Sequence, residues 1–328
     1  MLQLRDLFKR YTGSLRGYKW VYVVNNFLHR RRLIHNRALY QQHGVDKSIL
    51  APIGKKDFTA STGTPPWLDA PDALEKLVAH PDFTTFSTSE RAQLKNYVEN
   101  GFMVLKNFYT GAEADALIAE TERLRGAGKA DFNYTGRKMM DVHRHSDLID
   151  GHYFKNKRLL RLLHFVMGRP VIPFQTISFV EGSEQRAHSD SIHMMTEPEG
   201  YLIAAWTALE ATSLENGALF YYPGSHRLPI ITTQDYDSGN SYLRLGKGSY
   251  ARYEDKIDAV IAEHGLERTL FFAEKGDVFI WHANLLHGGS PIRRPGSSRR
   301  SMVAHYFCEG VICYHEISQR PALLERPE

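Results

Sequence analysis

The sequence predicts a mainly β protein with flanking helices, built on a double-stranded β-helix of the jelly-roll, cupin-like type. After residue 170 the chain alternates short apolar runs, rich in β-branched and aromatic residues, with turns of glycine and proline. Runs of this kind are typical of the strands of a two-sheet β fold. The clearest runs, which we expect to be strands, are 171–180, 201–209, 276–281 and 299–307.

A second observation supports this fold class: most helical patterns precede the strands, as expected for helices that flank a β core. Ser87 and Glu90 form a capping-box pattern, which predicts a helix that runs to about residue 99. A short strand is expected over 102–106. Further helices are expected over 111–124, 156–167 and 251–264. The last of these interrupts the run of strands, so we interpret it as a helical insertion into the β core.

The first 66 residues differ in charge from the rest, and we expect them to form a basic arm with a linker. Residues 5–56 contain twelve Lys or Arg and two Asp, a net charge of +10, whereas the whole chain carries +4. The remainder is therefore acidic. Pro65 and Pro66, which follow a Ser/Thr/Gly-rich stretch, mark the linker. The jelly-roll domain is then expected over 67–328.

Apolar and aromatic residues flanked by cations make this arm typical of a segment that meets anionic lipid. The run 20–28 lies between Lys19 and the triplet at 30–32. The alternative is a helical arm that packs on the core or on a second subunit of a homo-oligomer. No recognisable nucleic-acid-binding module accompanies the charge, so nucleic acid is not an expected partner.

The N-terminal arm and the cysteine content indicate the cellular compartment. The apolar run of the arm is too short to span a bilayer, and Arg5, Asp6 and Lys9 interrupt any cleavable signal pattern. Two cysteines, Cys308 and Cys313, in 328 residues fit a reducing compartment. We therefore expect a cytoplasmic protein, peripheral at the inner face of the membrane if the arm binds lipid.

The segment His188-Ser189-Asp190 supplies an imidazole and a carboxylate two positions apart. On an extended strand these two side chains point to the same face and can reach one ion. His287, followed by two glycines that let the backbone bend, would complete a set of two histidines and one carboxylate. This ligand set favours non-haem Fe(II) and leaves coordination positions open.

The sequence contains alternative candidates for these metal ligands. His145-Ser146-Asp147 repeats the His-x-Asp pattern, but it lies in a polar stretch that we interpret as a solvated loop. His188, in contrast, stands between two predicted strands. His282 precedes His287 by five residues, and we interpret it as a buried histidine that is not a ligand.

Arg299 lies twelve residues after His287, where the last long strand is expected to begin. A guanidinium group binds a carboxylate through two hydrogen bonds and stays charged. Beside a ferrous site, this residue suits a dicarboxylic cosubstrate such as 2-oxoglutarate. A hydrolase has no need of such a group.

Short blocks in a characteristic order link these residues to a known family. They are Asn100-Gly101-Phe102-Met103-Val104-Leu105, His188-Ser189-Asp190, Trp206-Thr207-Ala208-Leu209, Glu215-Asn216-Gly217-Ala218-Leu219, Pro223-Gly224-Ser225-His226, Gly276-Asp277-Val278, His287-Gly288-Gly289-Ser290-Pro291 and Arg299-Arg300-Ser301. In these blocks the chain resembles the phytanoyl-CoA dioxygenase family of Fe(II)- and 2-oxoglutarate-dependent oxygenases. The similarity covers about residues 90–307. An asparagine that often follows the His-Gly-Gly-Ser-Pro run is Ile292 here.

The resemblance implies a role for each matching residue. His188, Asp190 and His287 would bind iron, and Arg299 would pair with the 5-carboxylate of 2-oxoglutarate. Further contacts with this cosubstrate are implied for Ser290, Trp206, Ile177 and Lys138.

The resemblance also implies a reaction. The expected enzyme consumes O2 and hydroxylates an unactivated carbon of a small-molecule or lipid- or glycan-linked substrate, releasing succinate and CO2. The alternatives are a catalytically silent metal-binding jelly roll and a cupin-like metal-dependent hydrolase or isomerase.

Overall fold

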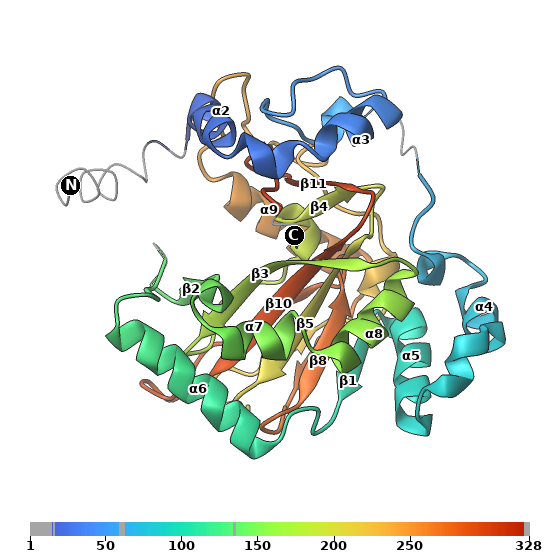
Figure 1. Ribbon diagram of the computed structural model, residues 1–328, viewed down its shortest axis with the longest axis vertical. Coiled ribbons are helices and arrows are strands. Elements are labelled where there is room, and N and C mark those ends of the chain that lie inside the picture. Colours follow the sequence, from blue (N-terminus) through green and yellow to red (C-terminus); the bar gives the residue numbers. More distant parts are fainter. Residues whose placement is uncertain (1–14, 16, 59–62, 134–135, 325–328) are drawn as a thin grey trace.

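A computed structural model describes residue 15 and residues 17–58, 63–133 and 136–324 of the chain. Its centre is a six-stranded antiparallel sheet in the order β1-β8-β5-β10-β3-β2 (Figure 1). The strands are β1 (Phe102–Leu105), β2 (Lys138–Met140), β3 (Val171–Phe179), β5 (Leu202–Ala208), β8 (Val278–His282) and β10 (Ser301–Cys308). The four long apolar runs of the sequence are thus neighbours in one sheet.

A second sheet covers one face of the first. It has the order β7-β6-β9 and consists of β6 (Leu219–Tyr221), β7 (Thr269–Phe271) and β9 (His287–Gly289). Trp206, Phe279 and Val303 of the large sheet pack against Leu219 and Phe271 of the small one. Two facing antiparallel sheets with flanking helices confirm the predicted jelly-roll core.

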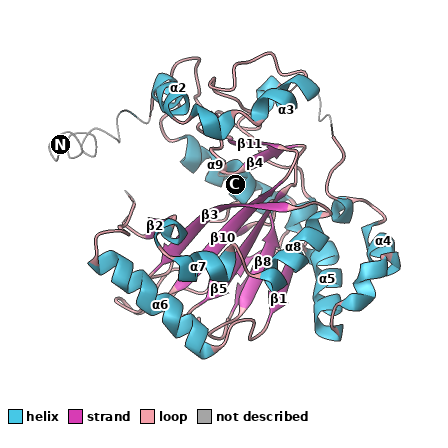
Figure 2. Ribbon diagram, in the orientation of Figure 1, coloured by secondary structure: helices cyan, strands magenta, loops and turns pink. Residues whose placement is uncertain are grey.

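Helices cover the opposite face of the large sheet, as Figure 2 shows. They include α5 (Thr88–Asn100), α6 (Gly111–Gly126), α7 (Asp147–Tyr153) and α8 (Lys157–Met167). Helix α4 (Ala73–Ala79) packs on the outside of α5 (Figure 2). The predicted capping box begins α5, where the Ser87 hydroxyl accepts from the Glu90 amide at 3.2 Å and the Glu90 carboxylate accepts from the Ser87 amide at 3.0 Å. The inserted helix α9 (Ser249–Glu263) begins two residues before its predicted start.

Two local predictions were wrong. The last long strand was expected to begin at Arg299, but β10 begins at Ser301 and Arg299 lies in the preceding loop. An extended backbone was assumed in arguing that His188 and Asp190 reach one ion, but Asp190 opens a 3-10 turn (Asp190–Ile192). The chain leaves the sheet there because the turn amides bond back to Asp190, whose carbonyl accepts from His193 and Met194.

The N-terminal arm packs on the body of the protein. Its helices α2 (Lys19–Leu28) and α3 (Asn36–Gln42) lie over a three-stranded sheet of β4 (Met195–Glu197), β11 (Ile312–His315) and β12 (Arg320–Pro321) (Figure 1). Leu33, Tyr40 and Ile53 of the arm share a core with Ile312 and Tyr314. The arm is thus fixed against the β core.

Some sequence features of the arm fall outside the described residues, among them Arg5, Asp6, Lys9 and the stretch at 61–62. The division at residue 66 stays a prediction. None of the helices in the described ranges combines the length and the apolar character that a bilayer-spanning segment needs. Cys308 and Cys313 are both buried free thiols.

Candidate metal centre

His188 and His287 are brought together by the backbone. They form an isolated antiparallel bridge in which the His188 amide donates to the His287 carbonyl at 3.0 Å and the His287 amide returns a bond of 2.9 Å. Their imidazole rings lie 4.5 Å apart, centre to centre. Asp190 follows from the 3-10 turn, so that one ligand atom from each of the three residues lies within 4.8 Å of the others. All three residues are buried.

Hydrogen bonds to backbone carbonyls orient both imidazoles. His188 Nδ1 lies 2.9 Å from the Arg186 carbonyl, and His287 Nδ1 lies 3.0 Å from the Leu285 carbonyl. A carbonyl only accepts, so Nδ1 carries the hydrogen and Nε2 presents its lone pair. Burial lowers the pKa of both imidazoles, which favours the neutral form that binds a metal.

One oxygen of Asp190 is held by the protein. Trp281 Nε1 donates to Asp190 Oδ2 at 2.7 Å, and His305 Nε2 lies 3.4 Å from the same oxygen. Asp190 Oδ1 lies 3.9 Å from His287 Nε2. Burial alone would raise the pKa of Asp190, but His287 and His305 outweigh it and keep this pKa below its usual range. The carboxylate is therefore ionised, with Oδ1 directed to the shared site.

This donor set fits Fe(II). Among the residues that the structure describes, His188, Asp190 and His287 form the only group of three or more such side chains that could hold a metal ion. The rival His145 lies in a 3-10 turn (Val142–His145) and lines a surface hollow with Asp147. His282 is buried and directs Nε2 to Asp69 Oδ2 at 3.1 Å.

A small inner cavity of about 60 Å³ adjoins the three residues. Arg299 lines it and is only 2% exposed. Its Nη1 donates to the Gly217 carbonyl at 2.9 Å, whereas Nε has no hydrogen-bond partner. Within the described ranges no carboxylate forms an ion pair with it. Burial lowers the pKa of Arg299 to about 10, so the guanidinium remains charged at neutral pH.

A buried charge without a counter-ion is costly. The Arg299 site is therefore suited to an anion that enters with a ligand, and a carboxylate of 2-oxoglutarate meets this requirement. Trp206 and Ile177 line the same cavity, with the Arg299 guanidinium carbon 5.8 Å from the centre of the Trp206 ring.

Lys138 and Ser290, the other two residues predicted to contact the cosubstrate, differ in position relative to the inner cavity. Lys138 lines the inner cavity, and its Nζ donates to Gln185 Oε1 at 3.0 Å. Ser290 is buried outside the cavity lining, and its hydroxyl accepts from Arg268 Nη2 at 2.6 Å. Contacts of either residue with the cosubstrate stay predictions.

Several residues that shape the site were not identified from sequence. Trp281, Gln185 and His305 all lie outside the motifs that the sequence analysis singled out. For His305 a signal existed, because it follows Val303 at the alternating position of β10 and both line the inner cavity. Trp281 could have been found only from the pairing of β5 with β8, which sets it opposite Ala204.

The inserted helix α9 supports the metal loop. Tyr253 is fully buried, and its hydroxyl accepts from the Ser189 amide at 3.0 Å. Arg186, two residues before His188, pairs with Asp255 at 2.8 Å and Asp258 at 2.5 Å. This helix therefore holds the segment that carries His188 and Asp190 at two points, Arg186 and Ser189.

An outer cavity of about 430 Å³ adjoins two of the three candidate ligands, His188 and Asp190. His188, Asp190 and His305 contribute to its lining, together with Asn25 and Arg32 from the N-terminal arm. Asn25 and His305, which are 280 positions apart, thus line one cavity.

Comparisons with known proteins identify the family of the chain. The phytanoyl-CoA dioxygenase (PhyH) family profile matches residues 97–301. Peroxisomal phytanoyl-CoA dioxygenase of Rattus norvegicus is 24% identical over 242 residues, which cover 65% of this chain and 67% of the relative. Ectoine dioxygenase of Bordetella parapertussis is 24% identical over 247 residues, covering 69% and 80%.

The fold is also similar to that of EctD from S. alaskensis, solved with 2-oxoglutarate and 5-hydroxyectoine. That comparison gives a TM-score of 0.56 at 19% identity, and it covers 74% of this chain and 85% of the other.

Proposed function

This chain belongs to the phytanoyl-CoA dioxygenase family of Fe(II)- and 2-oxoglutarate-dependent dioxygenases, and we propose that it hydroxylates an unactivated carbon of an organic substrate. The substrate is a small molecule or a lipid- or glycan-linked compound, and succinate and CO2 are released. The observation that carries this proposal is the uncompensated Arg299 guanidinium beside the His188, Asp190 and His287 cluster. A silent binding module or a hydrolase has no use for it.

His188 and His287 would hold the iron through Nε2, and Asp190 would hold it through Oδ1. When bound, iron and 2-oxoglutarate activate O2 for attack on a C–H bond, a reactivity that belongs to the cofactor. Arg299 binds the far carboxylate of 2-oxoglutarate and so fixes its orientation. The side chains of Trp206 and Ile177 exclude water from this chamber.

The outer cavity supports a finer proposal about the substrate. Its lining includes four cationic side chains, those of Arg32, Lys138, Arg144 and Arg320, against the two carboxylates Asp141 and Asp190. Asp141 Oδ2 lies 3.5 Å from Arg144 Nε, and Asp190 is assigned to the metal. Apolar side chains complete the lining, including Met140, Phe174, Phe307 and Leu323. This chemistry favours a substrate with an anionic group and an apolar part.

Substrate-stimulated release of succinate tests this proposal. The iron-loaded protein is supplied with 2-oxoglutarate, O2 and paired anionic and neutral members of a panel of lipids, sugars and amino acids. We expect stimulation by anionic, partly apolar members, and a KM for the best of them raised about fivefold in Arg320→Gln, or ~1 kcal/mol. Arg161→Gln on α8 is the control. Stimulation by neutral members alone would exclude an anionic substrate.

Loss of the Trp281 indole N–H is expected to weaken iron binding. Trp281→Phe keeps an aromatic side chain, though a smaller one, and removes the donor to Asp190 Oδ2. Removing a hydrogen-bond partner of a metal ligand costs about 10- to 100-fold in affinity, and we expect a loss of at least about tenfold here. Competition with a chelator measures it. Trp67→Phe, which removes a 3.0 Å bond to the Phe165 carbonyl far from the site, should leave the affinity unchanged. Equal affinities in all three proteins would refute this role of Trp281.

A further inference from the structure

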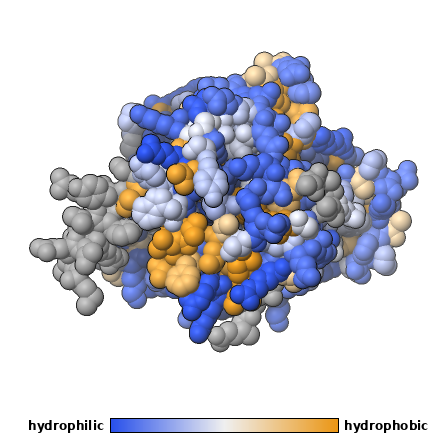
Figure 3. Space-filling model, turned by 90° about the horizontal axis from the view of Figure 1, so that it is seen from above, coloured by the Kyte–Doolittle hydropathy of each residue, from blue (hydrophilic) through white to orange (hydrophobic). Residues whose placement is uncertain are grey.

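The outward face of α2 carries an apolar stripe. Trp20, Val24, Phe27 and Leu28 are 53, 52, 55 and 69% exposed. Their spacing places them on one face of the helix. Figure 3 shows apolar surface on the side of the molecule where α2 lies, next to the grey atoms of uncertain placement. We call these four residues the α2 stripe.

The opposite face of α2 is anchored to the body of the protein. Lys19 is 4% exposed, and its Nζ donates to the Ser241 carbonyl at 2.6 Å and to Gln319 Oε1 at 2.7 Å. Asn26, also buried, donates to the Leu50 carbonyl at 3.0 Å. The stripe is therefore held in an outward position by buried polar contacts on the other side of its helix.

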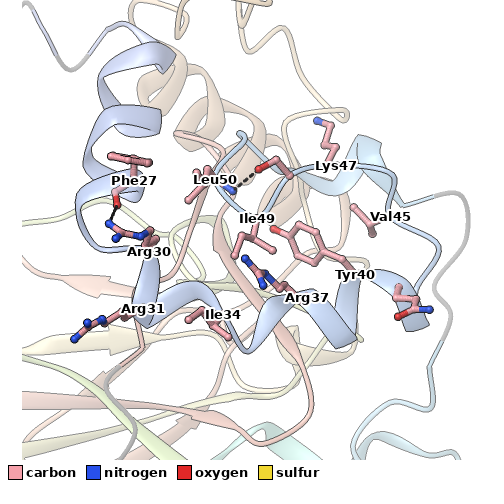
Figure 4. Close-up of a pocket in the computed structure, with 12 residues that line it drawn as sticks. Phe27, Arg30, Arg31, Ile34, Arg37, Tyr40, Val45, Lys47, Ile49 and Leu50 are labelled. Carbon is pink, nitrogen blue, oxygen red and sulfur yellow. Dashed lines mark hydrogen bonds between the residues drawn. The ribbon is translucent and has the colours of Figure 1, made fainter.

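A cationic groove of about 610 Å³ continues the stripe toward α3. Figure 4 shows Arg30, Arg31 and Arg37 around it, together with Phe27 and Ile34. No carboxylate is among the described residues that line the groove. Lys47, at its rim, lies 2.8 Å from Asp57. In the described part of the chain, the three arginines form no ion pair.

We propose that the α2 stripe and this groove dock on the surface of an anionic phospholipid bilayer. Exposed apolar and aromatic side chains enter the interfacial region, and arginines beside them bind lipid phosphates. The charge argues against a second copy as the occupant. An isologous contact on this face would bring each arginine cluster toward its own symmetry mate, with no described carboxylate in the groove to offset the repulsion.

Docking in this orientation brings the outer cavity close to the bilayer. That cavity's role as a substrate chamber rests on the proposed function. Asn25 and Asn26 of α2, and Arg32 just after it, line that cavity. The helix that meets the bilayer is therefore also a wall of the chamber beside the metal centre. A membrane lipid could present its anionic headgroup there directly from the bilayer surface.

Vesicle flotation of the full chain tests the docking surface. The vesicles consist of phosphatidylcholine alone or of phosphatidylcholine with phosphatidylglycerol. We expect the wild type to bind the anionic vesicles, and Phe27→Ser/Leu28→Ser to lose about 10-fold or more in affinity. Arg30→Gln/Arg31→Gln/Arg37→Gln should lose about 100-fold, because each charge contributes about fivefold.

Matched substitutions elsewhere provide the controls. Val78→Ser, on α4, replaces an apolar side chain that is 50% exposed, and Lys95→Gln/Lys157→Gln removes exposed cations from α5 and α8. Both should float like the wild type. Thermal unfolding confirms that each variant folds.

Three results would overturn the proposal. The first is no flotation of the wild type, and the second is equal flotation of the wild type and the α2 variants. The third is light scattering that shows a dimer which Phe27→Ser/Leu28→Ser converts to a monomer, because a second copy would then cover the stripe. Binding of iron and 2-oxoglutarate by the same proteins is measured separately, so failure of docking leaves the proposed reaction testable.

Discussion

Asp190→Ala is expected to abolish turnover and to remove stoichiometric Fe(II) binding. The substitution deletes the only carboxylate in the three-residue cluster and leaves two neutral imidazoles to bind a dication. The loss should exceed the about 100-fold that removal of a hydrogen-bond partner of a ligand can cost. Iron content after gel filtration and single-turnover succinate yield measure the two effects.

The sequence offers a matched control for this experiment. Asp147→Ala alters the second His-x-Asp pattern, whose carboxylate lines a surface hollow away from the cluster. It should keep wild-type iron content and activity. If Asp147→Ala loses iron while Asp190→Ala retains it, the assignment of the metal centre is wrong.

Arg299→Met is expected to raise the KM for 2-oxoglutarate by between about 30-fold and several thousand-fold. Truncation of one partner of a buried charge pair costs about 2–5 kcal/mol, and each 1.4 kcal/mol is a factor of ten. Without ligand, the variant should be at least as stable as the wild type, since methionine replaces a buried guanidinium whose Nε has no partner. 2-Oxoglutarate should then raise the melting temperature of the wild type but not of the variant.

Arg300→Met separates this effect from a general loss of charge. The Arg300 side chain points to the side opposite that of Arg299, where it pairs with Glu122 at 3.1 Å and Glu210 at 3.4 Å. Its removal should leave the KM for 2-oxoglutarate unchanged. A similar rise in both variants would show that Arg299 is not the carboxylate anchor.

The β core was predictable because its strands carry strong local patterns. Strands β3, β5, β8 and β10 begin and end within two residues of the apolar runs that predicted them. The turn at Asp190 was not predictable in this way. Its geometry depends on contacts from distant elements, among them the bond from the Ser191 amide to the Ala283 carbonyl.

The candidate ligands were identifiable from sequence, whereas the residues that orient them were not. His188, Asp190 and His287 form a pattern of ligand types with suitable spacing. Trp281 reaches Asp190 only because β8 pairs with β5 in one register. Contacts that depend on strand register carry no signal in the local sequence.

The N-terminal arm also makes contacts that local sequence patterns do not predict. Its charge and apolar residues predicted a surface segment, and the structure also gives it a share in the outer cavity. Arg32 and His188 line the same cavity although they are 156 positions apart, and no local pattern connects them. Which side of α2 is buried was likewise set by partners such as Gln319.

Anaerobic addition of Fe(II) and 2-oxoglutarate to the wild-type protein is the most direct test of the central claim, that three side chains and one guanidinium hold the iron and its cosubstrate together. We predict a weak visible charge-transfer band that is absent in Asp190→Ala and weakened in Arg299→Met. Folded, iron-loaded wild-type protein that develops no such band at saturating 2-oxoglutarate would contradict the account.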